Sequence, residues 1–512
     1  MSKTVVSHQE VLLLATAAVS IVAGIIYTYS NGTTKQDKHT PIRPPHVRSW
    51  IPYLGSALEM SADVLGFIRK KSQEKQASVF TATIAGDKCV FIADPEYVTI
   101  PFRPKFSKYL DGLSLQKQFS RTVLDCNNSE VDENFGKDIT KVDHSLYHTY
   151  LFKNEHLEES IAKVNTIFHR LVPALADQDN HSWKQHNLFD IVVRTVFKAT
   201  MGPFLSADLV SDDEIYDQFH IFDKGVIPLF NSAPNFLTEA ARSARSFLQC
   251  RIGSKHFWDE ASPLMMARKQ AFANHALSPG ALHKTNLGLL WASVGNTAPA
   301  VFWTLLLLLN DKNAWNACKT QMDDVVAKRK TPSDVFTLQE LDEMKFLESS
   351  FKEALRLYQG NFTTRKVVQD FVLAAREQKY IIEKGSNLMI WWGVLHRDPG
   401  VFGQNADSFQ YDRFVNKTKE DFSYQNGHPL THEPIMAFGG GSQYCPGRKF
   451  ASYETRLYLA MLMQSFDIKL VEGETIPGID PAMVGIGVCH PARDVKVQIR
   501  SKVDQCAEPM QQ

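Results

Sequence analysis

Residues 287–309 form a long apolar segment, and this segment sets the strongest limit on how the chain can fold. It ends in five consecutive leucines and, as a helix, is long enough to cross a bilayer. Three polar residues, Ser293, Asn296 and Thr297, lie near its centre, where a membrane would leave them without partners. We therefore expect a helix that passes through the core of a large soluble domain.

Pro299 adds a local irregularity to this expected helix. Its nitrogen cannot donate to the carbonyl of Gly295, four residues earlier, and its ring disfavours a straight helix. We expect the helix to open at Gly295, beside Asn296 and Thr297, and to leave a polar groove suited to a small polar ligand. The alternative is a kinked core helix whose polar side chains bond within the helix.

The rest of the body predicts one domain that is mainly α-helical with small β-sheets. Most of the sequence between about 145 and 359 has helical periodicity. Strand patterns occur early and late in the chain, at residues 79–84, 89–92, 367–373, 380–382 and 387–391. No repeat or low-complexity linker divides residues 53–500, so we expect a single domain there.

The first 30 residues predict a membrane anchor. Residues 11–29 carry no charge and would rise about 28 Å as a helix, close to the thickness of a thin bilayer. A cleaved signal peptide is the alternative, but the apolar run is long and no clear cleavage site follows. Several basic residues follow the run, so the positive-inside rule places the remainder of the chain in the cytosol.

Two further segments complete the expected order of the chain. Residues 31–52 contain several prolines, which fix the backbone and predict a rigid hinge between anchor and domain. Residues 501–512 are polar and predict a flexible tail.

Charge and cysteine content limit the possible partners. The 512 residues include 56 basic and 56 acidic side chains, whereas a nucleic-acid-binding protein would be strongly basic, so we expect no nucleic acid partner. The seven cysteines are scattered, and no pair has CxxC spacing. This pattern disfavours both a disulfide framework and a structural zinc site, and it leaves at least one cysteine to be explained.

Cys445 has a loop built around it, with four glycines between residues 439 and 447. Glycine permits unusual backbone conformations and the close approach of main chain to a ligand. Backbone N–H groups of such a loop, and the helix expected at 449–464, would stabilise a thiolate, which is the form that ligates metal. A glycine-rich turn with a buried structural cysteine is the alternative.

The spacing of Phe438, Gly441, Cys445 and Gly447 resembles the haem-binding loop of the cytochrome P450 family. The resemblance implies the cytochrome P450 fold, mainly α with small β-sheets and an N-terminal transmembrane helix. It also implies haem b (iron protoporphyrin IX) as cofactor and Cys445 as the axial ligand of its iron. Phe438, Gly441, Gly447 and Gln443 would line the haem.

Other segments match the family at the expected order. Glu353-Ala-Leu-Arg356 looks like its ExxR motif, and Arg413 looks like the arginine of its meander region. By resemblance, Arg413 contacts Glu353 and Arg356 and braces the haem-side fold. Arg365 looks like a ligand of a haem propionate.

The sequence departs from the family at three places. Arg or His usually stands where this chain has Gln443, which carries no charge. A Trp-x-x-x-Arg motif is missing from residues 147–157, where Lys153 or His156 would be weak substitutes. In the apolar helix, alignment on residues 290–292 puts Gly295 at the position of the family's acid and Asn296 at that of its threonine.

The family's acid and threonine positions are where we expect protons to be delivered to oxygen. A register shifted by one residue would assign Asn296 and Thr297 instead of Gly295 and Asn296. We therefore predict that Gly295, Asn296 and Thr297 form the oxygen side of the site, and that Asn296 or Thr297, with water, orients protons.

Segments at 44–45, 50–55, 290–303, 485–487 and 490–495 resemble the sterol 7α-/12α-hydroxylase and prostacyclin synthase branch. The resemblance implies a monooxygenase that hydroxylates a lipophilic steroid, terpenoid or related metabolite with O₂. Electrons would come from NADPH through NADPH-cytochrome P450 reductase. The enzyme would be a single-pass protein of the endoplasmic reticulum membrane, with residues 226–230 and 236–237 as a membrane-dipping loop or, alternatively, as ordinary core.

Two alternatives stay open. One is a prostacyclin-synthase-like haem-thiolate isomerase of a fatty-acid endoperoxide, which needs neither reductase nor O₂. The other is a membrane-tethered haem sensor with no enzymatic activity. Turnover with or without NADPH distinguishes the enzymes, and any substrate-dependent NADPH consumption excludes the sensor.

Overall fold

The computed structural model describes residues 40–176, 182–210, 212–330, 335–375, 378–441, 444–485 and 487–502. The anchor expected at residues 1–30, most of the hinge and nearly all of the tail lie outside these ranges, and so does Gln443.

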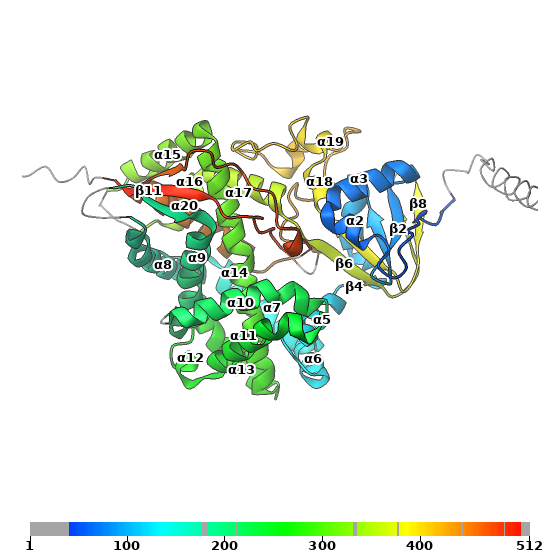
Figure 1. The fold of residues 1–512 in the computed structure, drawn as a ribbon, viewed down its shortest axis with the longest axis horizontal. Helices are drawn as coiled ribbons and strands as arrows, with labels where there is room; N and C mark the ends of the chain where they lie inside the picture. Colours follow the sequence, from blue (N-terminus) through cyan, green and yellow to red (C-terminus); the bar gives the residue numbers. More distant parts are fainter. Residues whose placement is uncertain are drawn as a thin grey trace, which may run out of the picture.

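Helices make up most of the molecule, as their periodicity predicted (Figure 1). The longer helices are α3 (Val64–Lys75), α5 (Ser114–Thr122), α7 (Lys137–Phe152), α8 (Asn154–Leu171), α9 (Leu188–Phe204), α10 (Asp213–Phe230), α11 (Asn235–Gly253), α13 (Pro263–Asn274), α14 (Pro279–Asn310), α15 (Lys312–Ala327), α17 (Lys345–Tyr358) and α20 (Arg448–Ser465). Shorter helices are α2 (Ala57–Ala62), α4 (Pro95–Val98), α6 (Asn128–Asn134), α12 (Lys255–Asp259), α16 (Leu338–Glu343), α18 (Gly393–His396) and α19 (Pro399–Phe402).

Early and late strands combine into one six-stranded sheet on one side of the molecule (Figure 1). Its order is β1 (His46–Val47), β2 (Val79–Ile84), β3 (Asp87–Ile92), β9 (Asn387–Trp391), β6 (Phe362–Val367) and β4 (Leu110–Asp111). The extended segment expected at 367–373 is not one strand, because a bend at 368–370 separates β6 from β7 (Phe371–Ala374), which pairs with β8 (Lys379–Ile382). A third sheet contains β10 (Phe466–Leu470), β11 (Lys496–Ser501) and β5 (Lys184–Asn187).

Helix α14 passes through the middle of the helical region, between α9 and α17 (Figure 1). The Ser278 side chain accepts a hydrogen bond from the N–H of Ala281, and Pro279 occupies the first turn, where no N–H is needed. Among the described residues, α14 alone is long and apolar enough to cross a membrane, and 72% of its most apolar window is buried. This burial agrees with the interpretation of residues 287–309 as a core helix.

The opening expected at Gly295 is wrong, because α14 continues as helix through Pro299. Val294, Ala298 and Pro299 are all buried, so packing on neighbouring helices holds the backbone helical although the Pro299 nitrogen donates no bond. The amide of Asn296 donates within the helix, to the carbonyl of Ala292 at 3.3 Å.

Candidate active site

The Cys445 loop closes on itself just before α20 begins. The backbone N–H of Cys445 donates to the carbonyl of Phe438 at 2.9 Å. Gly439 and Gly441 have φ angles of +80° and +65°, a region that other residues avoid. The predicted helix after the loop is confirmed as α20, which starts at Arg448.

Phe102, at the end of the short 3₁₀ helix η1 (Ile100–Phe102), lies against this loop. A Cβ added to Gly440 would be 2.8 Å from Cε of Met436 and 3.3 Å from Cδ1 of Phe102. A Cβ on Gly441 would be 3.2 Å from the carbonyl oxygen of Phe102. The glycines therefore permit both the turn and its close contact with a segment more than 300 residues away in the chain.

Two backbone amides distinguish Cys445 from the other cysteines that the structure describes. Burial raises the pKa of the Cys445 thiol, while hydrogen bonds from the backbone N–H groups of Gly447 and Arg448 act in the opposite direction. Four other cysteines are buried, and burial raises the pKa of each thiol to about 12 without such amide donors: Cys89, Cys126, Cys318 and Cys489. Amides directed at a sulfur are typical of a thiolate that ligates metal.

Arg365, on β6, is a half-buried cation near the same loop. Its guanidinium lies 5.4 Å from the ring centroid of Phe102 and donates to the carbonyl of Thr364 at 3.1 Å. Burial lowers the pKa of Arg365 to about 10. Within the described ranges no carboxylate forms an ion pair with it, so an anionic group in this space would stabilise its charge. The donor set of one thiolate and one free cation fits a haem with its propionates.

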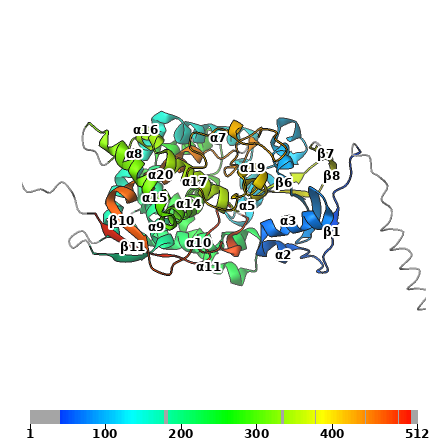
Figure 2. The same cartoon turned by 90° about the horizontal axis from the view of Figure 1, so that it is seen from above.

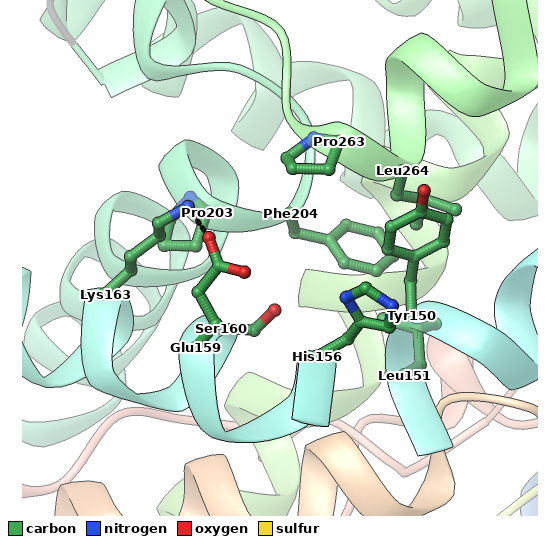
Figure 3. A pocket seen from close by; sticks show the side chains of 10 residues that line it. All are labelled: Tyr150, Leu151, His156, Glu159, Ser160, Lys163, Pro203, Phe204, Pro263 and Leu264. Atoms are coloured by element: carbon green, nitrogen blue, oxygen red, sulfur yellow. Dashed lines mark hydrogen bonds and ion pairs between the residues drawn. The ribbon is translucent and has the colours of Figure 1, made fainter. Parts of the chain in front are cut away.

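The weak substitutes for the missing propionate contacts do not reach this loop through any described contact. Lys153 is exposed where α7 ends. The ring of His156 lies 4.8 Å from that of Tyr150, in a small pocket that also contains Glu159 and Lys163 (Figure 3). That pocket lies between α7, α8, α9 and α13, and its volume is only about 20 Å³.

Glu353, Arg356 and Arg413 form a buried network behind the loop. Arg356 donates to both carboxylate oxygens of Glu353, at 2.6 and 3.0 Å, and Arg413 donates to one of them at 2.9 Å. The backbone N–H of Gln410 donates to the second oxygen at 3.0 Å. Glu353 is fully buried, so this complete pairing is what makes its charge tolerable there.

His396 connects this network to Met436, just before the cysteine loop. No pattern in the sequence predicted this role for His396. Its carbonyl accepts from Arg356 at 2.7 Å, and its Nε2 accepts from the backbone N–H of Met436 at 2.9 Å. Burial, with the nearby Arg356, lowers the pKa of His396 to about 3, which keeps the ring neutral and able to accept.

Asn296, in the middle of α14, connects this helix to the C-terminal part of the chain. Its Oδ1 accepts from the backbone N–H of Val488 at 3.1 Å, and a Cβ on Gly487 would lie 1.7 Å from that oxygen. Gly487 also accepts a backbone hydrogen bond from Gly360, just after α17, at 2.9 Å. Thr297 is buried. The structure thus brings Asn296 together with the loop at Gly487 and Val488, which in turn contacts the loop at Gly360.

Comparison with known proteins identifies the family. The cytochrome P450 family model matches residues 44–498. The chain belongs to the cytochrome P450 family. The resemblance inferred from the Cys445 loop is therefore confirmed, and so is the mainly α fold class.

Several curated P450 enzymes are similar along most of their length. Cholesterol 7-alpha-monooxygenase of Cricetulus griseus is 29% identical, with 90% of this chain and 94% of the relative aligned. The 7-alpha-hydroxycholest-4-en-3-one 12-alpha-hydroxylase of Oryctolagus cuniculus is also 29% identical, with 90% of this chain and 94% of the relative aligned. Cytochrome P450 7B1 of Mus musculus is 27% identical, with 90% of this chain and 91% of the relative aligned. These relatives belong to the sterol hydroxylase branch, so the predicted branch and the class of P450 monooxygenase are confirmed.

The fold also matches a solved P450 structure. The retinoic acid-bound cyanobacterial CYP120A1 has a TM-score of 0.69 at 19% identity, with 91% of this chain and 100% of that chain covered. Membership of the family implies a haem cofactor, a reductase as electron source and a lipophilic substrate. When bound, the haem supplies the oxygen-activating chemistry, and Cys445 and Arg365 are the described residues that would hold it.

Proposed function

We propose that this protein is a membrane-anchored monooxygenase that hydroxylates a steroid or a closely related lipophilic molecule. The observation that carries the proposal is the similarity to sterol 7α- and 12α-hydroxylases over nine tenths of the chain. The amide pair directed at Cys445 supports the same chemistry, because it favours a thiolate ligand for haem iron.

Each predicted site residue has a role in this proposal. Cys445 is the axial ligand of haem b, and Phe438, Gly441 and Gly447 shape its loop. Arg365, together with Gln443, holds the propionates. Glu353, Arg356 and Arg413 brace this side of the site, and the polar groups at Gly295, Asn296 and Thr297 guide protons on the other side.

The membrane side of the enzyme is supported by exposed apolar residues near α2 and α11. Phe236 and Leu237, at the start of α11, are 77% and 64% exposed, and Trp50 and Leu58 are 89% and 60% exposed. Helices α2 and α11 lie toward the same side of the molecule (Figure 2). The proposed membrane contact therefore includes residues 236–237 but not all of 226–230, because Val226 and Leu229 are buried in the core.

In this proposal, the enzyme is a single-pass protein of the endoplasmic reticulum membrane, and its domain faces the cytosol. NADPH-cytochrome P450 reductase delivers the electrons from NADPH. This arrangement follows from the apolar, uncharged residues 11–29 and the basic residues that follow them.

The test is turnover by the purified, haem-loaded protein in vesicles with NADPH-cytochrome P450 reductase. We expect hydroxylated product from a panel of sterols only when NADPH, reductase and O₂ are all present. Terpenoids of similar size serve as the comparison panel. Isomerisation of an endoperoxide without NADPH would contradict the proposal and support the isomerase alternative.

A further inference from the structure

Helix α14 carries no side chain at Gly295, and two other residues, one from α14 and one from α10, lie beside this position. A Cβ built on Gly295 would lie 3.3 Å from Nε1 of Trp291 and 3.5 Å from Oδ1 of Asp223. Trp291 is one turn earlier on α14, and Asp223 belongs to α10. A carboxylate from another helix therefore lies in van der Waals contact with the position where a side chain of residue 295 would begin.

A hydrogen bond holds the side chain of Asp223 in place, but no cation pairs with it among the described residues. It is 7% exposed, and Nε1 of Trp291 donates to its Oδ1 at 2.8 Å. Other buried acids in the described ranges pair with a cation: Glu130 with Lys284, Asp208 with Arg251 and Glu353 with two arginines. Asp223 forms no ion pair there, so its oxygens stay available to a water molecule.

Glu454 is the natural comparison, because it is also buried without a cation. Its partner is the hydroxyl of Thr200, and it lines neither the pocket at His156 nor the cavity at Asp223. Asp223 differs in that it lines a cavity of about 370 Å³ together with Gly295 and Pro299. At about 30 Å³ per molecule, the cavity has room for on the order of ten waters.

The walls of this cavity suit water. Besides Asp223, they include charged and titratable side chains from α9, α10 and the C-terminal segment: Asp190, His220, Lys224, Asp480, His490 and Asp494. Gly295 also lines the cavity, and its carbonyl receives no hydrogen bond from Pro299, so it can accept one from water. The next residues along the helix are Asn296 and Thr297.

We propose that Asp223 supplies to the active site the proton-carrying carboxyl group that α14 lacks at Gly295. The Asp223 carboxyl group gives its proton to the water held at the Gly295 carbonyl, beside Asn296, and that water passes a proton on to the reduction of oxygen. The Asp223 carboxylate then takes up a proton that the cavity waters relay from bulk solvent. Trp291 is a positioning residue that fixes the carboxyl group through its N–H. This inference rests on the proposed monooxygenase function, which consumes protons when oxygen is reduced.

The decisive variant is Asp223→Asn, because the amide oxygen still accepts from Trp291 while the group no longer carries a transferable proton. We expect the product formed per NADPH to fall, with kcat reduced on the order of 10²-fold, KM nearly unchanged and a larger solvent isotope effect. Asp217→Asn is the matched control, since this exposed acid lies on the same helix but does not line the cavity, and it should behave like the wild type.

Two readouts separate proton supply from a structural role. With iodosylbenzene, which donates an oxygen atom without protons, Asp223→Asn should hydroxylate substrate as fast as the wild type. In ¹⁵N-tryptophan-labelled protein, the Trp291 indole resonance, assigned by its loss in Trp291→Phe, should persist in Asp223→Asn and shift in Asp223→Leu. Equal loss of the iodosylbenzene and NADPH reactions, or wild-type coupling in Asp223→Asn, would overturn the proposal.

A rescue variant tests the position directly and does not depend on the stability of Asp223→Asn. In the Asp223→Ala background, which vacates the space, Gly295→Asp places a carboxyl group on α14 itself, and coupling should partly return. No return in a folded, haem-loaded double variant would count against Asp223 as the proton source. Product formation by the wild type without NADPH would overturn the monooxygenase function instead, so the two failures are distinct.

Discussion

The Cys445 loop and the part of α14 around Gly295 are built in different ways. The loop is one contiguous segment, residues 438–447, with its network of Glu353 and two arginines fully paired behind it. Around Gly295, by contrast, α14 meets two distant parts of the chain: Asp223 of α10 lies beside Gly295, and the backbone N–H of Val488 donates to Asn296. In the proposed function, the haem would therefore be held by a local, rigid segment, whereas protons would be handled by groups that different helices and loops contribute.

This difference predicts two kinds of defect. Substitutions around Cys445 should change haem binding or the free energy of unfolding. Substitutions around Gly295 should leave both nearly intact and change how electrons are used. The predictions below test this division.

Cys445→Ser should have the largest effect. A hydroxyl is not a thiolate ligand, so the reduced carbon monoxide complex should lose its thiolate-type spectrum completely. Cys250→Ser, at an exposed cysteine, is the control and should keep the spectrum. A thiolate-type spectrum in Cys445→Ser would mean that the axial ligand is misassigned.

Glu353→Ala should destabilise the fold by about 3–5 kcal/mol, because it leaves the buried Arg356 and Arg413 without their carboxylate. Urea unfolding monitored by circular dichroism gives the value, and haem content should fall in parallel. Glu348→Ala removes a carboxylate from the same helix that pairs only with Lys345 and Lys352, so it should change stability by less than about 1 kcal/mol. Similar losses in both variants would refute the special role of the network.

Gly441→Ala should destabilise the loop by about 1–3 kcal/mol through its φ of +65°, and the contact with the Phe102 carbonyl should add to this. Gly427→Ala separates the two causes, since Gly427 has a φ of +78° but no atom within 4 Å of an added Cβ. Only Gly441→Ala should also weaken haem retention, measured by transfer of haem to apomyoglobin. Equal haem loss in both would contradict the contact.

His396 should make stability depend on pH. The folded state keeps its ring neutral down to about pH 3, whereas the unfolded chain binds a proton near pH 6.5. Stability from this group is fully present above pH 6.5 and falls as the pH drops toward 3, by up to about 1.4 kcal/mol per pH unit. His396→Gln should therefore lose stability less steeply than the wild type between pH 6.5 and 5 in urea titrations. Parallel curves would show that His396 is not held neutral.

Asn296→Ala should have the smallest effect on stability, about 1 kcal/mol, from the lost hydrogen bond with Val488. Its main expected effect is more NADPH consumed per product formed, with an unchanged haem spectrum. Ser293→Ala, which removes a hydroxyl bonded only to the Leu290 carbonyl, is the matched control. Loss of haem from Asn296→Ala would contradict the prediction that substitutions around Gly295 leave haem binding nearly intact.

Much of the Cys445 side could be predicted from the sequence, because its signals are local. The glycines, the cysteine and the following helix occupy one segment, and Glu353 and Arg356, three residues apart, share one helix face. The boundaries of β2 and β9 were also predicted, since short runs rich in apolar and β-branched residues mark them.

The other side could not be predicted in the same way. Asp223 and Val488 reach α14 only through tertiary packing, so no spacing in the sequence connects them with Gly295. The continuity of α14 through Pro299 was missed because packing of neighbouring helices outweighs one absent hydrogen bond. His396 was missed because its function depends on a backbone N–H, that of Met436, which any residue would supply.

The six-stranded sheet has a consequence for how the chain is made. Strand β3 pairs with β9, and Cys89 faces Asn387, about 300 residues later. At about 5–20 residues per second, a ribosome needs roughly 15–60 s to produce the missing strand. During synthesis the β2–β3 hairpin therefore waits with one edge unpaired, which makes it a target for chaperones and a site of aggregation when they are scarce.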